Sequence, residues 1–363
     1  MNKFSLRPFD GAALIGFLCL PWLFHAKPAE LFRENNSAVW IVLSIAAVLT
    51  LLLFLAVSAL SSRHPGENIV EISQSLLGKP FARVYGAALA LYFVYFAGVH
   101  AREAAETLKM YGMELTPIYV IAGLIILTAL VMNRFGGNAI VKTAGFFFIL
   151  ILLGIIFAVL IAANSYNADH LFPILGNGAG EIAKSSLFSA SLFSPVIALS
   201  LLAPHFKDPA AMRKSGVISI AVSGGAAVSL SLCFAMRFSP AVVSTMMSGF
   251  MEIGKSSYFN HFFYRFEPLL LFFIIFAALL TSTAALMLAQ KSAENVLPKK
   301  KLPIVFFLAG IAFIFACLPE NIFVLTDVWL APAQRCSVLF LAGIPLFMLA
   351  VSVIKNRKRG GKA

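Results

Sequence analysis

The 363-residue chain is poor in charged residues. They make up 12% of the sequence, while hydrophobic residues make up 60%; in soluble domains charged residues are roughly a quarter of the total. The mean hydropathy is +0.90. Apolar runs of about 20 residues recur along the chain, each long enough to cross the ~30 Å hydrocarbon core of a bilayer as a helix. The ~10-residue alternation of a membrane β-barrel is missing. The composition therefore predicts an all-α integral membrane protein.

Cysteines and enzyme motifs are also scarce. The four cysteines lie in or beside apolar runs without paired spacing: Cys19, Cys233, Cys317 and Cys336. This pattern is typical of small buried residues rather than of a disulfide framework or a metal site. HExxH, GxSxG, CxxC and a Walker A loop are missing, and so is a pair of carboxylates within a span. We therefore expect no enzymatic activity, no metal and no cofactor.

The few charges are distributed unevenly along a series of ten predicted spans in one domain (1–363). If the N-terminus is cytoplasmic, the inside segments hold 19 of the 28 Lys and Arg residues and five of the 16 acids. The positive-inside rule favours this orientation, with both termini cytoplasmic. The net charge of +12 then reflects basic residues that anchor the topology, with binding of anionic lipid as a secondary role, and does not indicate nucleic acid. Spans 1–5 cover about 9–163 and spans 6–10 about 182–354: 9–32, 38–61, 82–108, 117–134, 140–163, 182–204, 214–236, 261–287, 302–318 and 334–354.

Two connections exceed simple turns. Residues 62–81 read as an amphipathic cytoplasmic segment along the membrane interface. Residues 238–260 contain enough Met and Phe to fold back over the outer side as a cap.

Prolines interrupt two spans at corresponding positions of the two halves. Pro21 lies in span 1 with Gly16 before it, and Pro195 lies in span 6. Paired Gly/Pro interruptions of this kind predict a 5+5 inverted repeat with broken spans 1 and 6, similar to the LeuT-like transporter fold, with a binding site at the breaks. A simple packing kink is the alternative for each proline.

The breaks favour a site for a small zwitterion. Pro21 frees the carbonyl of Phe17, and Gly16 permits unwinding; helix ends then attract a carboxylate and an ammonium. Five serines precede Pro195 and either pack or line a cavity: Ser185, Ser186, Ser189, Ser191 and Ser194. We predict ligand contacts from Gly16, Leu18, Pro21, Tyr92, Tyr95, Ser189, Ser194, Phe276 and Thr281. Structural or gating roles are predicted for Pro195, Arg265 and Glu267.

The predicted spans also lack acidic residues near the middle of the membrane. We expect Arg102, Glu103 and Glu106 of span 3 at the outer headgroups, and His100 as a packed, hydrogen-bonded residue. Spans 1, 3, 6 and 8 then offer no mid-membrane carboxylate, which a proton-coupled carrier usually needs.

Five segments of the chain form a recognisable series: GFLCLP (16–21), LTPIYVI (115–121), FPILGNG (172–178), YRFEPLLLF (264–272) and IPLFMLAVSVIKNRK (344–358). Together they resemble the spore germination permease family, the B-subunits of nutrient germinant receptors within the amino acid–polyamine–organocation superfamily. In that order they correspond to the family's broken span 1, the start of span 4, the lead into span 6, the Arg-x-Glu opening of span 8, and the last span with its basic tail.

The chain departs from the family pattern at two places. Pro195-Val196 stands where the family commonly has Gly-Glu, and Asn138 and Lys142 stand where it has Glu and Arg. Two carboxylates are thereby replaced, which bears on ion coupling and on ligand preference.

The resemblance implies a membrane subunit in the inner membrane of a bacterial spore. It implies a small-molecule germinant, often an amino acid, and A- and C-subunits as partners. Three functions compete at this point: a ligand-sensing receptor subunit, a working amino-acid carrier, and an ion-conducting or structural subunit. The absent carboxylates favour sensing over proton-driven uptake, and the broken spans favour either of these over a structural role.

Overall fold

The computed structural model describes residues 5–257, 266–296 and 301–360. Within these residues seven helical stretches are long and apolar enough to cross a membrane. Three shorter apolar helices accompany them: Pro8–Cys19, Ile118–Arg134 and Ile304–Cys317. The prediction of an all-α membrane protein is confirmed, whereas the number of crossings stays a prediction.

The first half of the chain runs from α1 to α7, and two of its spans carry shorter attached elements. The elements are α1 (Pro8–Cys19), η1 (Pro21–Phe24), α2 (Lys27–Asn35), α3 (Val39–Arg63), α4 (Ile69–Leu77), α5 (Lys79–Tyr111), α6 (Ile118–Arg134) and α7 (Gly137–Ala162).

The second half repeats this layout, again with a broken first helix. The elements are α8 (Ala179–Phe193), η5 (Ser194–Leu201), α9 (Pro209–Arg237), α10 (Pro240–Val243), α11 (Gly249–Ser256), α12 (Glu267–Glu294), α13 (Lys301–Cys317), α14 (Ile322–Val324), η7 (Leu325–Leu330), α15 (Ala331–Val338), η8 (Leu339–Gly343) and α16 (Ile344–Gly360).

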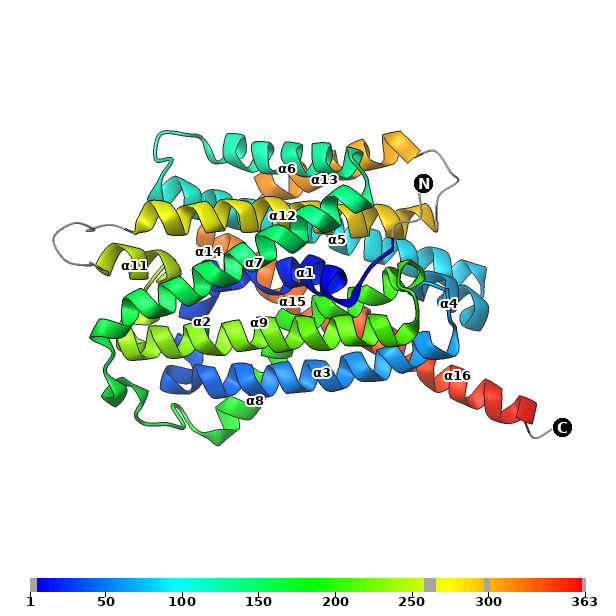
Figure 1. The fold of residues 1–363 in the computed structure, drawn as a ribbon, viewed down its shortest axis with the longest axis horizontal. Coiled ribbons are helices and arrows are strands. Elements are labelled where there is room, and N and C mark those ends of the chain that lie inside the picture. The colour runs from blue at the N-terminus through cyan, green and yellow to red at the C-terminus, as the bar shows by residue number, and fades with distance from the viewer. Residues whose placement is uncertain (1–4, 258–265, 297–300, 361–363) are drawn as a thin grey trace.

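The broken helix α1 lies at the centre of the bundle (Figure 1), where it contacts α7, α9, α12 and η5. Every residue from Gly11 to Cys19 is buried. A helix that is apolar all round is expected in such a position. The centre of the protein is therefore the place where the first break occurs.

The two longer connections contain short helices in their described parts, while the side of the membrane on which each lies stays a prediction. Helix α4 lies within 62–81 and begins with a capping box, in which Asn68 accepts from the backbone of Glu71 and Glu71 accepts from the backbone of Asn68. Helix α11 packs on η1: the rings of Phe24 and Phe250 are 4.9 Å apart, and Ser248 donates to the Phe24 carbonyl at 2.6 Å. The segment 238–257 thus covers the first break at the end formed by η1.

The predicted limits of two spans are wrong. The last helical stretch begins at Ile322 rather than at 334, because the polar stretch around Asp327, Pro332 and Gln334 remains helical. Helix α12 extends to Glu294, about two turns beyond the predicted end at 287.

Candidate functional site

The first break has a defined backbone geometry. Helix α1 ends at Cys19 and a 3₁₀ turn begins at Pro21. Pro21 has no N–H, so the Phe17 carbonyl lacks its helical donor. Thr281 of α12 supplies the missing hydrogen bond through Oγ1 at 2.6 Å. In addition, Trp22 donates from Nε1 to the Cys19 carbonyl at 2.7 Å.

The second break follows the same scheme. Helix α8 ends at Phe193, and Pro195 opens the 3₁₀ helix η5. The carbonyl that Pro195 deprives of its helical donor belongs to Ser191, and Ser194 donates to it from its backbone N–H and from Oγ, the latter at 2.7 Å. The Cys19 thiol donates to the Phe193 carbonyl at 3.7 Å, so the two breaks touch.

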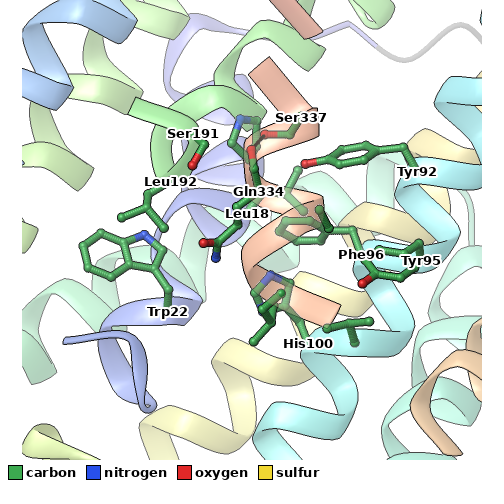
Figure 2. A pocket seen from close by; sticks show the side chains of 14 residues that line it. Leu18, Trp22, Tyr92, Tyr95, Phe96, His100, Ser191, Leu192, Gln334 and Ser337 are labelled. Atoms are coloured by element: carbon green, nitrogen blue, oxygen red, sulfur yellow. Dashed lines mark hydrogen bonds between the residues drawn. The ribbon is translucent and has the colours of Figure 1, made fainter. Parts of the chain in front are cut away.

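A cavity lies between the breaks and α5. Its polar groups come from Tyr92 and His100 of α5, Ser191 of α8, and Gln334 and Ser337 of α15. Figure 2 shows the Tyr92 hydroxyl pointing toward Ser337, with Gln334 between Trp22 and Tyr92. The remaining wall is mainly apolar: Leu18, Trp22, Tyr95, Phe96, Val99, Leu192, Pro195, Leu330 and Ala333. An apolar wall with a few convergent polar groups is the usual composition of a small-molecule site.

The cavity is narrow in this conformation. Its volume is about 30 Å³, which is room for two or three water molecules at ~10–15 Å³ each. A ligand of amino-acid size therefore requires the lining side chains to move apart.

The side of the cavity formed by α15 is flanked by two π-helical segments, η7 and η8. Such segments are rare and frequent at functional sites. Ser337 of α15 also contacts the second break directly, since its Oγ lies 2.9 Å from Ser194 Oγ. Sequence reasoning missed Gln334 and Ser337 because this stretch was placed at or before the start of the last span. The residues Pro332 and Gln334 within an otherwise apolar run are the signal that could have revealed it.

A second cavity of about 40 Å³ lies on the other side of the same wall. Ser191, Leu192 and Gln334 line both cavities. The second cavity adds Lys27, Glu30 and Glu34 of α2 and Ser185 and Ser189 of α8. Three shared side chains thus separate the inner cavity from a charged outer one.

The residues predicted to bind a ligand divide into two groups. Leu18, Tyr92 and Tyr95 line the inner cavity together with Pro195, and Ser189 lines the outer one. The others lie close to the breaks or to α12 but line neither cavity: Gly16, Pro21, Ser194, Phe276 and Thr281.

Gly16 and Phe276 have packing contacts instead. Gly16 lies inside α1, and a Cβ at this position would be 2.2 Å from the Phe148 ring of α7. The ring of Phe276 stacks on that of Phe147 with centroids 4.2 Å apart. Glu267 is the first residue of α12, and Arg265 lies outside the described residues.

Three residues that depart from the family pattern lie away from the cavity. Asn138 and Lys142 are exposed near the start of α7. Val196 is fully buried in η5.

Two of the charges on α5 that were expected at the outer headgroups are buried within the protein. Arg102 is 6% exposed and Glu103 only 1% exposed. Helix α5 continues to Tyr111, and the outer half of span 1 packs beside it: His25, which follows η1, contacts Thr107 at 2.8 Å. A buried carboxylate therefore lies one turn beyond His100, which lines the cavity.

Comparison with known sequences gives one family. A profile described as "Spore germination protein" matches residues 26–323. Spore germination protein YndE of Bacillus subtilis (strain 168) is 22% identical over 331 residues, which cover 89% of this chain and 88% of that protein. Spore germination protein KB of the same organism is 26% identical over 210 residues, which cover 56% of each chain.

Solved structures share the fold at low sequence identity. MHP1, a nucleobase-cation-symport-1 family transporter in a closed conformation with bromovinylhydantoin bound, has a TM-score of 0.68 and 14% identity. The match covers 95% of this chain and 78% of that one. MhsT in complex with L-phenylalanine has a TM-score of 0.65 and 12% identity, covering 97% and 89%. The predicted transporter-like fold is confirmed.

Proposed function

Because the chain belongs to the spore germination permease family, we propose that it is the membrane subunit of a nutrient germinant receptor. In this proposal it binds a small nutrient, an amino acid in the first instance, and the bound state triggers germination. The observation that carries the proposal is the cavity between the two broken spans.

The cavity has suitable chemistry for an amino acid. Tyr92, Ser191 and Gln334 offer hydroxyl and amide groups that can bind either a carboxylate or an ammonium. Leu18, Trp22 and Phe96 offer apolar contact to a side chain. Because the cavity is narrow, binding must favour a state in which α15 and the broken spans lie further apart. A ligand that binds one state better shifts the population toward it.

The proposed receptor function also implies partner subunits and a location in the cell. A- and C-subunits would read the state of the broken spans, and the complex would lie in the inner membrane of a bacterial spore with both termini of this subunit cytoplasmic. The whole of 1–363 would act as one transmembrane domain in this complex.

A second candidate is a permease that transports its amino-acid or cation ligand. The buried Glu103 favours it, since ionisable groups within spans often belong to ion pathways.

A binding screen on the purified chain in lipid nanodiscs tests the proposal. Amino acids, sugars and nucleosides are added one at a time, and heat of binding is measured by titration calorimetry. We expect saturable binding of at least one amino acid, weakened about tenfold or more by Gln334→Leu, because one hydrogen bond is lost at the ligand. Gln74→Leu is the matched control, since Gln74 is exposed on α4. Binding that is equally strong in Gln334→Leu and wild type, or no binding from any of the three classes, would contradict the proposal.

A further inference from the structure

A buried polar cluster adjoins the cavity at the His100 end. Its members come from both sides of the first break: His25 follows η1, while His100, Glu103 and Thr107 belong to α5. They are 4%, 7%, 1% and 5% exposed in that order. Burial of these four polar side chains is unfavourable unless they form hydrogen bonds or ion pairs with one another.

The hydrogen bonds fix part of the proton arrangement. His100 Nδ1 lies 2.8 Å from Glu103 Oε2. Thr107 Oγ1 donates its single hydroxyl hydrogen to the Glu103 carbonyl at 3.2 Å. His25 Nδ1, 2.8 Å from the same hydroxyl oxygen, is therefore the donor to it.

Few other titratable groups can balance the charge of Glu103. Those that act on it are His25 after η1, His100 on its own helix and Lys27 on α2. Lys27 forms an ion pair with Glu30 at 2.7 Å.

Arg102, the residue before Glu103 on α5, pairs with Glu106 at 2.8 Å and donates to the Ala316 carbonyl of α13 at 3.2 Å. The charge of Arg102 is therefore balanced by Glu106 and not by Glu103.

A carboxylate buried without a balancing charge is strongly unfavourable. The cluster escapes this cost by holding one proton, either on an imidazole beside an ionised Glu103 or on Glu103 itself. Both arrangements keep the 2.8 Å contact between His100 and Glu103. Loss of the proton leaves one uncompensated negative charge in the interior.

We propose that Glu103, His100 and His25 form a proton-binding site next to the ligand cavity. The His100 ring belongs to both, because it lines the cavity while its Nδ1 bonds Glu103. Its other nitrogen, Nε2, is left for a ligand. Proton and ligand then influence each other's affinity by the same factor. This inference goes beyond the proposed function, since the site follows from the cluster whether the subunit senses or transports.

The proton itself is the probe in the test. The full chain, with ¹⁵N-labelled histidine, is placed in nanodiscs at pH 8, where a free imidazole with a pKa near 6.5 is neutral. Nitrogen NMR detects an imidazolium, and infrared spectroscopy detects a protonated carboxyl group.

We expect the wild type to show one of these two signals at pH 8. Glu103→Gln removes the acid while keeping the shape of the side chain, so the signal disappears. Glu106→Gln, three residues further along α5, leaves it unchanged. His100→Gln provides a second variant that alters the signal if Glu103→Gln does not fold. A wild-type protein at pH 8 with an ionised Glu103 and only neutral imidazoles overturns the proposal, whatever the binding screen gives. A signal that survives Glu103→Gln in folded protein overturns it as well.

Discussion

Thr281 Oγ1 donates a hydrogen bond to the carbonyl oxygen of Phe17 at 2.6 Å, joining residues 264 positions apart in the chain. The Phe17 carbonyl is the one that Pro21 leaves without a helical donor. The Ser191 carbonyl before Pro195 is paired locally, since Ser194 donates to it from both its backbone N–H and its Oγ. Both carbonyls are thus paired, the first by a hydroxyl group of another helix and the second within its own turn, which meets the requirement that buried backbone groups be paired within a membrane protein. Neither the Phe17 nor the Ser191 carbonyl is therefore left without a hydrogen-bond donor.

The first prediction concerns this hydroxyl. Thr281→Val keeps the shape of the side chain but removes the donor, so the Phe17 carbonyl stays buried and unpaired. We expect a loss of about 1–3 kcal/mol in the free energy of unfolding, measured by SDS titration, with Thr281→Ser close to wild type. Thr128→Val is the control, because Thr128 bonds only its own helix at the Leu124 carbonyl. Equal stability of Thr281→Val and wild type would show that the bond does not hold the break closed.

A second prediction concerns the contact of α1 with α7. Gly16→Ala places a Cβ about where the Phe148 ring lies, 2.2 Å from its nearest atom. Overpacking of this kind costs about 1–3 kcal/mol, and Phe148→Leu in the same chain should restore part of it. Gly145→Ala on α7 is the control, since its Cβ would meet its nearest neighbour at 3.9 Å. If the losses in free energy of unfolding from Gly16→Ala and Phe148→Leu simply add in the double variant, the two residues are not in direct contact.

The third prediction concerns the π-helical segment η7. Tyr95 donates to the Trp329 carbonyl at 2.5 Å, and the two rings stack at 6.1 Å. Tyr95→Phe keeps the ring and removes the bond, which is worth about 1 kcal/mol. Backbone hydrogen exchange at Leu325–Leu330 should accelerate roughly fivefold. Tyr119→Phe serves as control, because Tyr119 is 60% exposed on α6. Unchanged exchange in Tyr95→Phe would show that the hydrogen bond from Tyr95 does not stabilise η7.

The fourth prediction concerns topology. Exposed Cys317 and Cys336 are replaced by serine, and single cysteines are introduced at Ser75 on α4 or Ala168 in the connection after α7. The charge distribution predicts that an impermeant thiol reagent labels Ala168→Cys from outside and Ser75→Cys only from inside. Labelling of both from one side would refute the predicted orientation.

The sequence predicted the breaks but not what closes them. Pro21 and Pro195 are local signals, because a proline removes a hydrogen bond at a known position. The partner of the Phe17 carbonyl lies on a distant helix, and no local pattern identifies it. Thr281 was expected near a ligand, whereas its hydroxyl bonds the backbone.

The charges of α5 and the polar face of α15 were harder to predict for a related reason. Glu103 was placed by its distance along a span, but its burial depends on the outer half of span 1 beside it. Gln334 was placed at the very start of a span, because Asp327 and Pro332 lower the apolar character of a stretch that is helical in the structure. In both cases tertiary packing, rather than local composition, decides the environment.

Uptake into proteoliposomes tests the receptor account most directly. The purified chain is reconstituted, and accumulation of the radiolabelled amino acid found in the binding screen is compared with its equilibrium binding, with and without a pH gradient. A sensor needs only a difference in affinity between two states, and about 1.4 kcal/mol changes their ratio tenfold. We predict saturable binding whose affinity depends on pH, without accumulation above the outside concentration. Gradient-driven accumulation by this subunit alone, abolished by Glu103→Gln and retained in Glu106→Gln, would contradict the receptor account and establish a proton-coupled carrier.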